Sequence, residues 1–153
     1  MTASGSAPPF VPGDFAVPGE LVTEKFRLEP LGPQHNAADY DAWTSSMEHI
    51  RATPGMVDDS WPREMTLEEN RGDLERHARD FAGRTGFTYT VLASDGSRVV
   101  GCVYIYPSDT PGTAVVQSWV RADRAELDVP LHDAVSAWLA DAWPFTAVSY
   151  DPR

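Results

Sequence analysis

Apolar residues in the middle of the chain fall into three runs with the composition of consecutive β-strands. The first covers residues 86–93 and the second residues 98–106, and both are rich in β-branched and aromatic side chains. The Asp95-Gly96 pair between them is a strong signal for a β-hairpin. A third run, residues 113–121, follows a loop that contains proline and glycine. These patterns predict a three-stranded meander.

Helical spacing of apolar residues marks three further segments. Residues 33–49 begin with a proline, which the first turn of a helix tolerates, and carry large apolar side chains at helical intervals. A second helix begins at Thr66, because Thr66 and Glu69 have the spacing of a capping box, and it ends before Gly86. Residues 129–142 form a third amphipathic pattern.

Two shorter runs, at residues 24–31 and 144–150, predict a first and a last strand. The resulting order is β-α-α-β-β-β-α-β, so we expect an α/β (mixed α+β) fold. Residues 21–153 are long enough for a single domain with its own core. Residues 1–20 form a Pro- and Gly-rich N-terminal arm.

The N-terminal arm contains Phe10, Val11, Phe15 and Val17, apolar groups that a free tail would not need. The last predicted strand would expose one unpaired edge, and bare edges of apolar strands invite association. We therefore expect the arm to lie on the domain and cover this edge. The alternative is that a second copy of the chain pairs with the edge. The protein is accordingly expected to be a monomer or an edge-mediated homodimer.

The charge of the chain limits its partners. With a net charge of −11 over 153 residues, this acidic protein lacks the clustered Lys and Arg that bind nucleic acid or an anionic membrane. Cys102 is the only cysteine, which excludes an intrachain disulfide. The sequence contains neither a run of about 18 apolar residues nor a secretion signal, so we expect a cytoplasmic protein.

Several short motifs accompany this order of elements. Residues 26–31 read Phe-Arg-Leu-Glu-Pro-Leu, residues 99–103 contain a Val-Gly pair, and residues 119–123 read Trp-Val-Arg-Ala-Asp. Over residues 24–150 the chain resembles the GNAT acetyltransferase superfamily, whose first, third and fourth strands carry similar motifs. The resemblance implies a GNAT-like mixed β-sheet flanked by helices, and the transfer of an acetyl group from acetyl-CoA to an amine.

The resemblance also implies a cofactor site at the end of the fourth strand. Acyl-CoA would be held there by the backbone amides of Trp119, Val120 and Arg121. The side chain of Arg121 or Arg124 would supply positive charge. The remaining partner would be a small-molecule substrate in the adjoining cleft.

Residues 124–130 depart from the family's pattern at this site. The family has a glycine-rich loop there, whose amides approach the pyrophosphate closely. This segment contains no glycine, and it contains Glu126 and Asp128. A carboxylate about 5 Å from a phosphate charge costs about 3 kcal/mol at an effective dielectric of about 20, so the loop opposes the acetyl-CoA that the resemblance implies. The helix and two strands that follow the family's fifth strand are a second departure, because only residues 151–153 follow here.

No residue stands out as catalytic. His49, which follows Glu48 at the end of a predicted helix, is the better candidate for a general base, by position alone. The four histidines lie on three predicted helices without a His-x-x-x-His or Glu-x-x-His pair, so we expect no metal site.

Two groups of residues are candidates for substrate binding. The loop that corresponds to the family's acceptor side contains Asp58, Asp59 and Trp61, whose carboxylates and ring face suit a cationic amine. Tyr104 and Tyr106 point to one face of the predicted sheet, where they would line a cleft. Each group also has a structural explanation, an acidic surface loop in the first case and an aromatic core in the second.

Two functions of different class follow. The first is a GNAT-related N-acyltransferase that acts on a small amine. The alternative is a non-catalytic GNAT-like module that has lost the coenzyme A site and binds a ligand or partner in the same cleft. The missing glycines favour the module, and the resemblance favours the enzyme.

Overall fold

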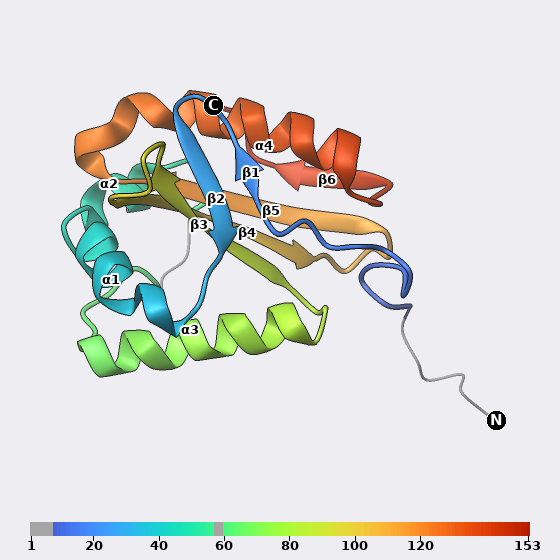
Figure 1. Ribbon diagram of the computed structural model, residues 1–153, viewed down its shortest axis with the longest axis horizontal. Helices are drawn as coiled ribbons and strands as arrows, with labels where there is room; N and C mark the ends of the chain where they lie inside the picture. The colour runs from blue at the N-terminus through green and yellow to red at the C-terminus, as the bar shows by residue number, and fades with distance from the viewer. Residues whose placement is uncertain (1–7, 57–59) are drawn as a thin grey trace.

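The computed structural model describes residues 8–56 and 60–153. Within these residues one six-stranded sheet has the strand order β1-β2-β3-β4-β5-β6 (Figure 1). Neighbouring strands are antiparallel except β5 and β6, which run parallel. The strands are β1 (Leu21–Val22), β2 (Phe26–Pro30), β3 (Phe87–Ala93), β4 (Val99–Pro107), β5 (Thr113–Val120) and β6 (Ala147–Tyr150).

Helices cover both faces of the sheet (Figure 1). Helix α4 (Asp128–Ala142) lies on one face, and α1 (Asn36–Thr44), α2 (Met47–Ala52) and α3 (Leu67–Ala82) lie on the other. Two short 3-10 helices, η2 (Pro33–His35) and η3 (Ala122–Leu127), lead into α1 and α4. The predicted fold class is therefore confirmed, with β1 and the 3-10 helices as additions. None of the helices in the described part of the chain is long and apolar enough to cross a membrane.

The sheet separates two buried clusters of apolar side chains. On the α4 face, Phe87, Tyr89 and Val91 of β3 belong to one cluster with Leu131 and Val135 of α4. The alternation of side chains along a strand places the residues between them on the other face.

The second cluster lies between the sheet and helices α1 to α3. It joins Cys102 of β4 and Trp119 of β5 to Trp43 of α1 and Leu74 of α3. Burial raises the pKa of the Cys102 thiol well above its usual value, so the thiol is a neutral core group at pH 7.

Two local signals form the structures that they predict. Gly96 in the β3–β4 turn has a φ of 77°, in the left-handed region that glycine adopts without a steric penalty. At the start of α3, the Glu69 amide donates to the Thr66 hydroxyl over 3.0 Å. The Thr66 amide donates back to the Glu69 carboxylate over 2.9 Å, which completes the capping box.

The single helix predicted over residues 33–49 is wrong, because the segment is broken into η2, α1 and α2. The break falls at two serines. The Ser45 hydroxyl donates to the carbonyls of Asp41 and Ala42, in competition with the helical amides. The Ser46 hydroxyl instead accepts the amide of Ala122, which ties the break to the end of β5.

The described part of the N-terminal arm packs on the α4 face. Val11 is buried, and Phe10 stacks on Phe145 with ring centroids 5.0 Å apart. The Arg84 guanidinium donates to the carbonyls of Pro12 and Phe15 over 2.6 and 2.9 Å. The arm thus contacts the segment that leads into β6, while residues 147–149 of β6 are exposed. A homodimer through that edge stays a prediction.

Candidate functional site

The parallel pairing of β5 and β6 covers only the first half of β5. Register runs from Thr113 opposite Ala147 to Val116 opposite Tyr150, and β5 then continues to Val120 paired only with β4. We call the place where residues 117–120 separate from residues 151–153 the β5–β6 junction. The resemblance to the GNAT superfamily places coenzyme A at this junction.

The side chain of Arg153 fills the β5–β6 junction and is only 4% exposed. Its Nη2 donates to the Ser118 carbonyl over 2.9 Å and to the Ser118 hydroxyl over 3.1 Å. Its Nε forms an ion pair with Asp128 Oδ2 at 2.8 Å. Nη1 adds bonds to the carbonyls of Pro54 and Asp151. One guanidinium therefore joins the end of β5 to the first turn of α4.

The residues predicted to hold the cofactor have other partners. The Arg121 amide donates to the Val100 carbonyl, and the Arg121 guanidinium is paired with Asp41 and Asp123, each at 3.2 Å. Arg124 is paired with Glu126 at 2.8 Å. The side chains of Trp119 and Val120 are fully buried, Trp119 on the face of the sheet opposite α4.

These residues do not fit a coenzyme A pyrophosphate. The first turn of α4 presents the Asp128 carboxylate, whose Oδ1 is buried without a hydrogen-bond partner among the described residues. Pro130 removes one amide of the same turn, and the Ser118 carbonyl is already used by Arg153. An anion brought to this turn would meet a carboxylate instead of free amides.

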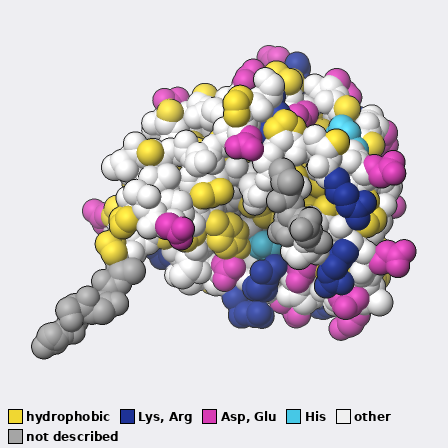
Figure 2. Space-filling view, turned by 180° about the vertical axis from the view of Figure 1, so that it is seen from behind, with side chains coloured by type: hydrophobic (Ala, Val, Ile, Leu, Met, Phe, Trp, Pro, Cys, Tyr) yellow, Lys and Arg dark blue, Asp and Glu magenta, His cyan; other side chains and the backbone are white. Residues whose placement is uncertain are grey.

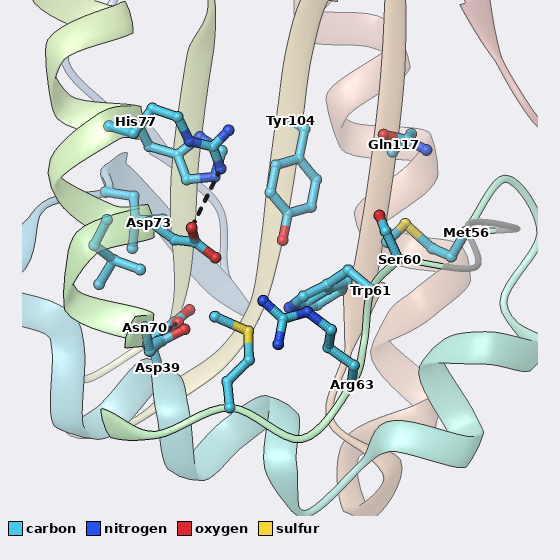
Figure 3. Close-up of a pocket in the computed structure, with 14 residues that line it drawn as sticks. Asp39, Met56, Ser60, Trp61, Arg63, Asn70, Asp73, His77, Tyr104 and Gln117 are labelled. Atoms are coloured by element: carbon cyan, nitrogen blue, oxygen red, sulfur yellow. Dashed lines mark hydrogen bonds and ion pairs between the residues drawn. The ribbon is translucent and has the colours of Figure 1, made fainter. Parts of the chain in front are cut away.

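A pocket of about 540 Å³ opens on the opposite face, between α3, the segment that precedes α3, and the sheet (Figure 3). We call it the α3 pocket. In Figure 2 basic, acidic and His side chains lie next to one another and next to hydrophobic ones on this side of the molecule. The side chains used below are Asp39, Trp61, Arg63, Asp73, Arg76, His77 and Tyr104, all of which line the pocket.

One stripe of α3 forms a wall of the pocket. Asn70, Asp73, Leu74 and His77 have the spacing i, i+3, i+4, i+7, so they share one face of the helix. The capping box holds the first turn of α3 in place ahead of this stripe. The register of the helix therefore decides which polar groups face the α3 pocket.

Asp39 of α1 is a buried carboxylate, 4% exposed, at the foot of the α3 pocket. Burial raises its pKa to about 6, against the lowering effects of the Asn70 hydrogen bond and of His35. Asn70 donates to Asp39 Oδ2 over 3.2 Å. No Lys, Arg or His forms an ion pair with Asp39 among the described residues.

His77 is held by hydroxyl groups on the sheet. The Tyr106 hydroxyl donates to Asp80 Oδ2 over 2.8 Å, so its oxygen accepts from His77 Nδ1 at 2.9 Å. Thr88 Oγ1 lies 3.0 Å from the same nitrogen. We therefore assign the Nδ1–H tautomer, which leaves Nε2 as an acceptor without a partner in the described structure. Burial lowers the pKa of His77 to about 4, so the ring is neutral at pH 7.

An aromatic cluster closes the other side of the α3 pocket. The ring of Trp61 lies between those of Trp43 and Trp119, with centroid separations of 5.3 and 6.1 Å. Trp119 Nε1 donates to the Tyr104 hydroxyl over 3.0 Å. Trp61 and Tyr104 line the pocket, and their contacts with Trp43 and Trp119 behind them give it a fixed, apolar surface beside its charged wall.

The structure separates the remaining predicted site residues. Trp61 and Tyr104 line the α3 pocket, whereas Tyr106 lies behind His77 and orients it. Asp58 and Asp59 lie outside the described residues. Glu48 and His49, on α2, do not line the pocket. No cluster of His, Cys, Asp and Glu suited to a metal ion occurs in residues 8–56 and 60–153.

Sequence reasoning missed Asp39 and His77. His77 and Asp80 are three residues apart on an amphipathic helix, but only the sheet brings Tyr106 between them. Asp39 lies between apolar positions of a predicted helix, and a buried acid in such a position is the signal that could have been used.

Comparison with known proteins finds similarity in three-dimensional structure only. No family model matches the sequence, and a search of the curated proteins finds no match. Solved structures do match in fold. The ribosomal-protein-S5-alanine acetyltransferase from Vibrio fischeri has a TM-score of 0.62 and 11% identity, over 80% of this chain and 68% of its own.

Two further structures show the same similarity. The microcin C7 self-immunity acetyltransferase MccE, in complex with acetyl-CoA and AMP, has a TM-score of 0.62 and 11% identity, over 82% of this chain and 67% of its own. FdhC, a nucleotide-linked sugar GNAT, has a TM-score of 0.56 and 12% identity, over 81% and 66%. The chain thus spans about two thirds of the length of these proteins. The chain has the fold of the GNAT acetyltransferase superfamily.

Proposed function

We propose that this protein is a GNAT-fold module that binds a small polar molecule in the α3 pocket and has lost the coenzyme A site. The observation that carries the proposal is the position of Arg153. Its guanidinium bonds the end of β5 and the first turn of α4, the two elements between which the resemblance places acyl-CoA. Cofactor binding would have to break a buried ion pair, and breaking such pairs costs about 3–5 kcal/mol.

The α3 pocket supports the second half of the proposal. Among the described residues, its buried carboxylate has no ionic partner and one of its imidazole nitrogens has no hydrogen-bond partner, and its aromatic rings are held in place by their own contacts. Unsatisfied polar groups in a concave surface are expensive to maintain in the free protein. A ligand that satisfies them would explain why they are there.

N-acyl transfer to a small amine is the second candidate. It is favoured by the fold alone, because the similar structures are acetyltransferases and one of them contains acetyl-CoA. In this case the α3 pocket would hold the acceptor amine, and Nε2 of His77 would accept a proton from it. The candidate requires Arg153 to leave the β5–β6 junction.

Titration calorimetry with acetyl-CoA separates the two candidates. We expect a dissociation constant no better than about 1 mM, which corresponds to about −4 kcal/mol. A micromolar constant would show that the β5–β6 junction opens, and the acyltransferase would then be preferred. The variant Arg153→Met serves as the control, because removal of the guanidinium should not by itself create affinity while Asp128 remains.

Binding to the α3 pocket has its own signal. The indole groups of Trp43, Trp61 and Trp119 belong to the pocket side of the sheet, and those of Trp138 and Trp143 belong to the α4 side. In an NMR screen of small polar compounds, a pocket ligand should shift the first three indole N–H signals and leave the other two unchanged. If no compound produces this pattern, the proposed function fails.

A further inference from the structure

We infer that the α3 pocket takes a small zwitterion, an aminocarboxylate whose ammonium group faces Asp39 and whose carboxylate faces Arg63. The inference rests on the proposed function, since it specifies the ligand class of the same pocket. It follows from charges of both signs that face one cavity without neutralising each other.

The acidic side of the pocket is rich in acceptors. Asp39 is a buried carboxylate, and the one hydrogen bond found for it comes from Asn70. Asp73 lies on the same wall, and its contact with Arg76 is long, at 3.8 Å, between side chains that are 41% and 53% exposed. His77 Nε2 adds a neutral acceptor. An ammonium group, with three hydrogens and a positive charge, matches this wall better than a neutral donor does.

The basic side of the pocket is formed by Arg63. Figure 3 shows Arg63 reaching in beside Trp61, while Asp39 and Asn70 lie at the foot of α3. Its guanidinium donates to the Glu64 carbonyl over 3.2 Å and forms no ion pair within the described residues. Arginine presents a planar fork of donors that suits a carboxylate.

These opposite charges do not cancel within the protein. The groups that act on the pKa of Asp39 are Asn70, His35 and Asp73, and no arginine is among them. The charge of Arg63 acts on Glu69, which lies outside the pocket, and not on Asp39. A simple amine would therefore satisfy Asp39 without engaging Arg63, and a simple acid would do the reverse. Only a ligand with both charges completes both sides. The rings of Trp61 and Tyr104 line the same pocket, Trp61 beside Arg63, and suit an apolar side chain of the ligand.

The test uses matched sets of three compounds on the full chain. Phenylalanine is compared with phenethylamine and 3-phenylpropionate, and leucine with 3-methylbutylamine and 4-methylpentanoate. In calorimetry we expect at least one amino acid to bind about tenfold more tightly than both of its singly charged counterparts. Only the pocket-side indole signals should shift.

Three variants locate each charge. Asp39→Asn should weaken the amino acid about tenfold and leave the acid unaffected, whereas Arg63→Gln should weaken the amino acid and leave the amine unaffected. Arg71→Gln is the matched control, because Arg71 is exposed on α3 and does not line the pocket.

The outcomes separate this inference from the proposed function. If an amine or an acid binds as tightly as its amino acid, or if no amino acid binds at about 10 mM, the inference that the ligand is a zwitterion is wrong. The proposed function survives that result as long as another polar compound shifts the indole signals of Trp43, Trp61 and Trp119. If no compound shifts them, both fail.

Discussion

The β5–β6 junction and the α3 pocket both hold charged side chains away from water, but they use them differently. At the junction, Arg153 and Asp128 form an ion pair at 2.8 Å, and the guanidinium makes further bonds to backbone carbonyls. In the pocket, Asp39 is equally hidden yet has no cationic partner in the described structure. The junction neutralises its charges by an ion pair within the protein, whereas Asp39 in the pocket forms no such pair with a described residue.

This difference assigns a role to each region. Breaking an ion pair that is shielded from water is costly, so the Arg153–Asp128 pair leaves little for a ligand to gain. A buried carboxylate without a cationic partner lowers stability, so its presence suggests a ligand that supplies the missing charge. The β5–β6 junction, where the GNAT fold suggests a cofactor, is thus filled by the protein's own side chains. The α3 pocket is the region that remains open to a ligand.

Breaking the Arg153–Asp128 ion pair at the β5–β6 junction should have the largest effect on stability. Replacing Arg153 with Met leaves the partly buried Asp128 carboxylate without its ionic partner, and we expect the free energy of unfolding to fall by about 3 kcal/mol. Chemical denaturation measures it. The double variant Arg153→Met with Asp128→Asn should recover part of the loss, because no charge is then left unpaired. If the single and double variants are equally unstable, the ion pair is not the cause.

Removing the Asp39 charge from the α3 pocket should raise the free energy of unfolding, the opposite of the effect expected at the junction. Asp39→Asn keeps an acceptor for Asn70 and removes the buried charge, so we expect the protein to gain about 2 kcal/mol at pH 7. The folded pKa of about 6 exceeds the ordinary aspartate pKa of 3.8, so the folded state binds more protons between these values. The unmodified protein therefore gains stability as the pH falls through about 6 toward about 4, and loses it as the pH rises.

The pH dependence gives the control for that prediction. The stability difference between Asp39→Asn and the unmodified protein should be full above pH 6 and should shrink as the pH approaches about 4. His35 and Asp73, the groups that act on the charge of Asp39, are present in both proteins, so the difference reports the Asp39 carboxylate together with its coupling to these two groups. A difference that is constant from pH 4 to 7 would mean that Asp39 does not titrate in this range.

The sequence predicted those parts of the molecule that depend on local chemistry. The Asp95-Gly96 turn and the Thr66–Glu69 capping box each involve residues at most three apart, and both form. The order of strands and helices also follows from local periodicity. The break between α1 and α2 was missed, because the Ser46 hydroxyl is drawn to the amide of Ala122, a partner that is distant in the sequence.

The two charged regions were beyond local reasoning for the same reason. The partner of Asp128 is Arg153, and the group that orients His77 is Tyr106, each more than twenty residues away. The sequence predicted that Glu126 and Asp128 are unsuited to a phosphate, but it could not show which group neutralises Asp128. Pairs of side chains that are far apart in the sequence are brought together only by the complete fold, so local patterns do not predict them.

The smallest predicted effect tests whether the pocket wall depends on its helix cap. Replacing Thr66 with Ala removes the acceptor of the Glu69 amide and should lower the free energy of unfolding by about 1 kcal/mol, as measured by chemical denaturation. Thr66 lies outside the α3 pocket and is exposed, so the charges of Asp39, Asp73 and His77 are unchanged. Thr66→Ser is the matched control, because serine keeps the hydroxyl acceptor and should restore most of the stability. Ligand affinity in the pocket should stay the same in both variants, since the folded state keeps the register of α3. If Thr66→Ala weakens ligand binding while it leaves the unfolding midpoint unchanged, the cap positions the wall instead of stabilising the helix, and the separation between stability and binding drawn here is wrong.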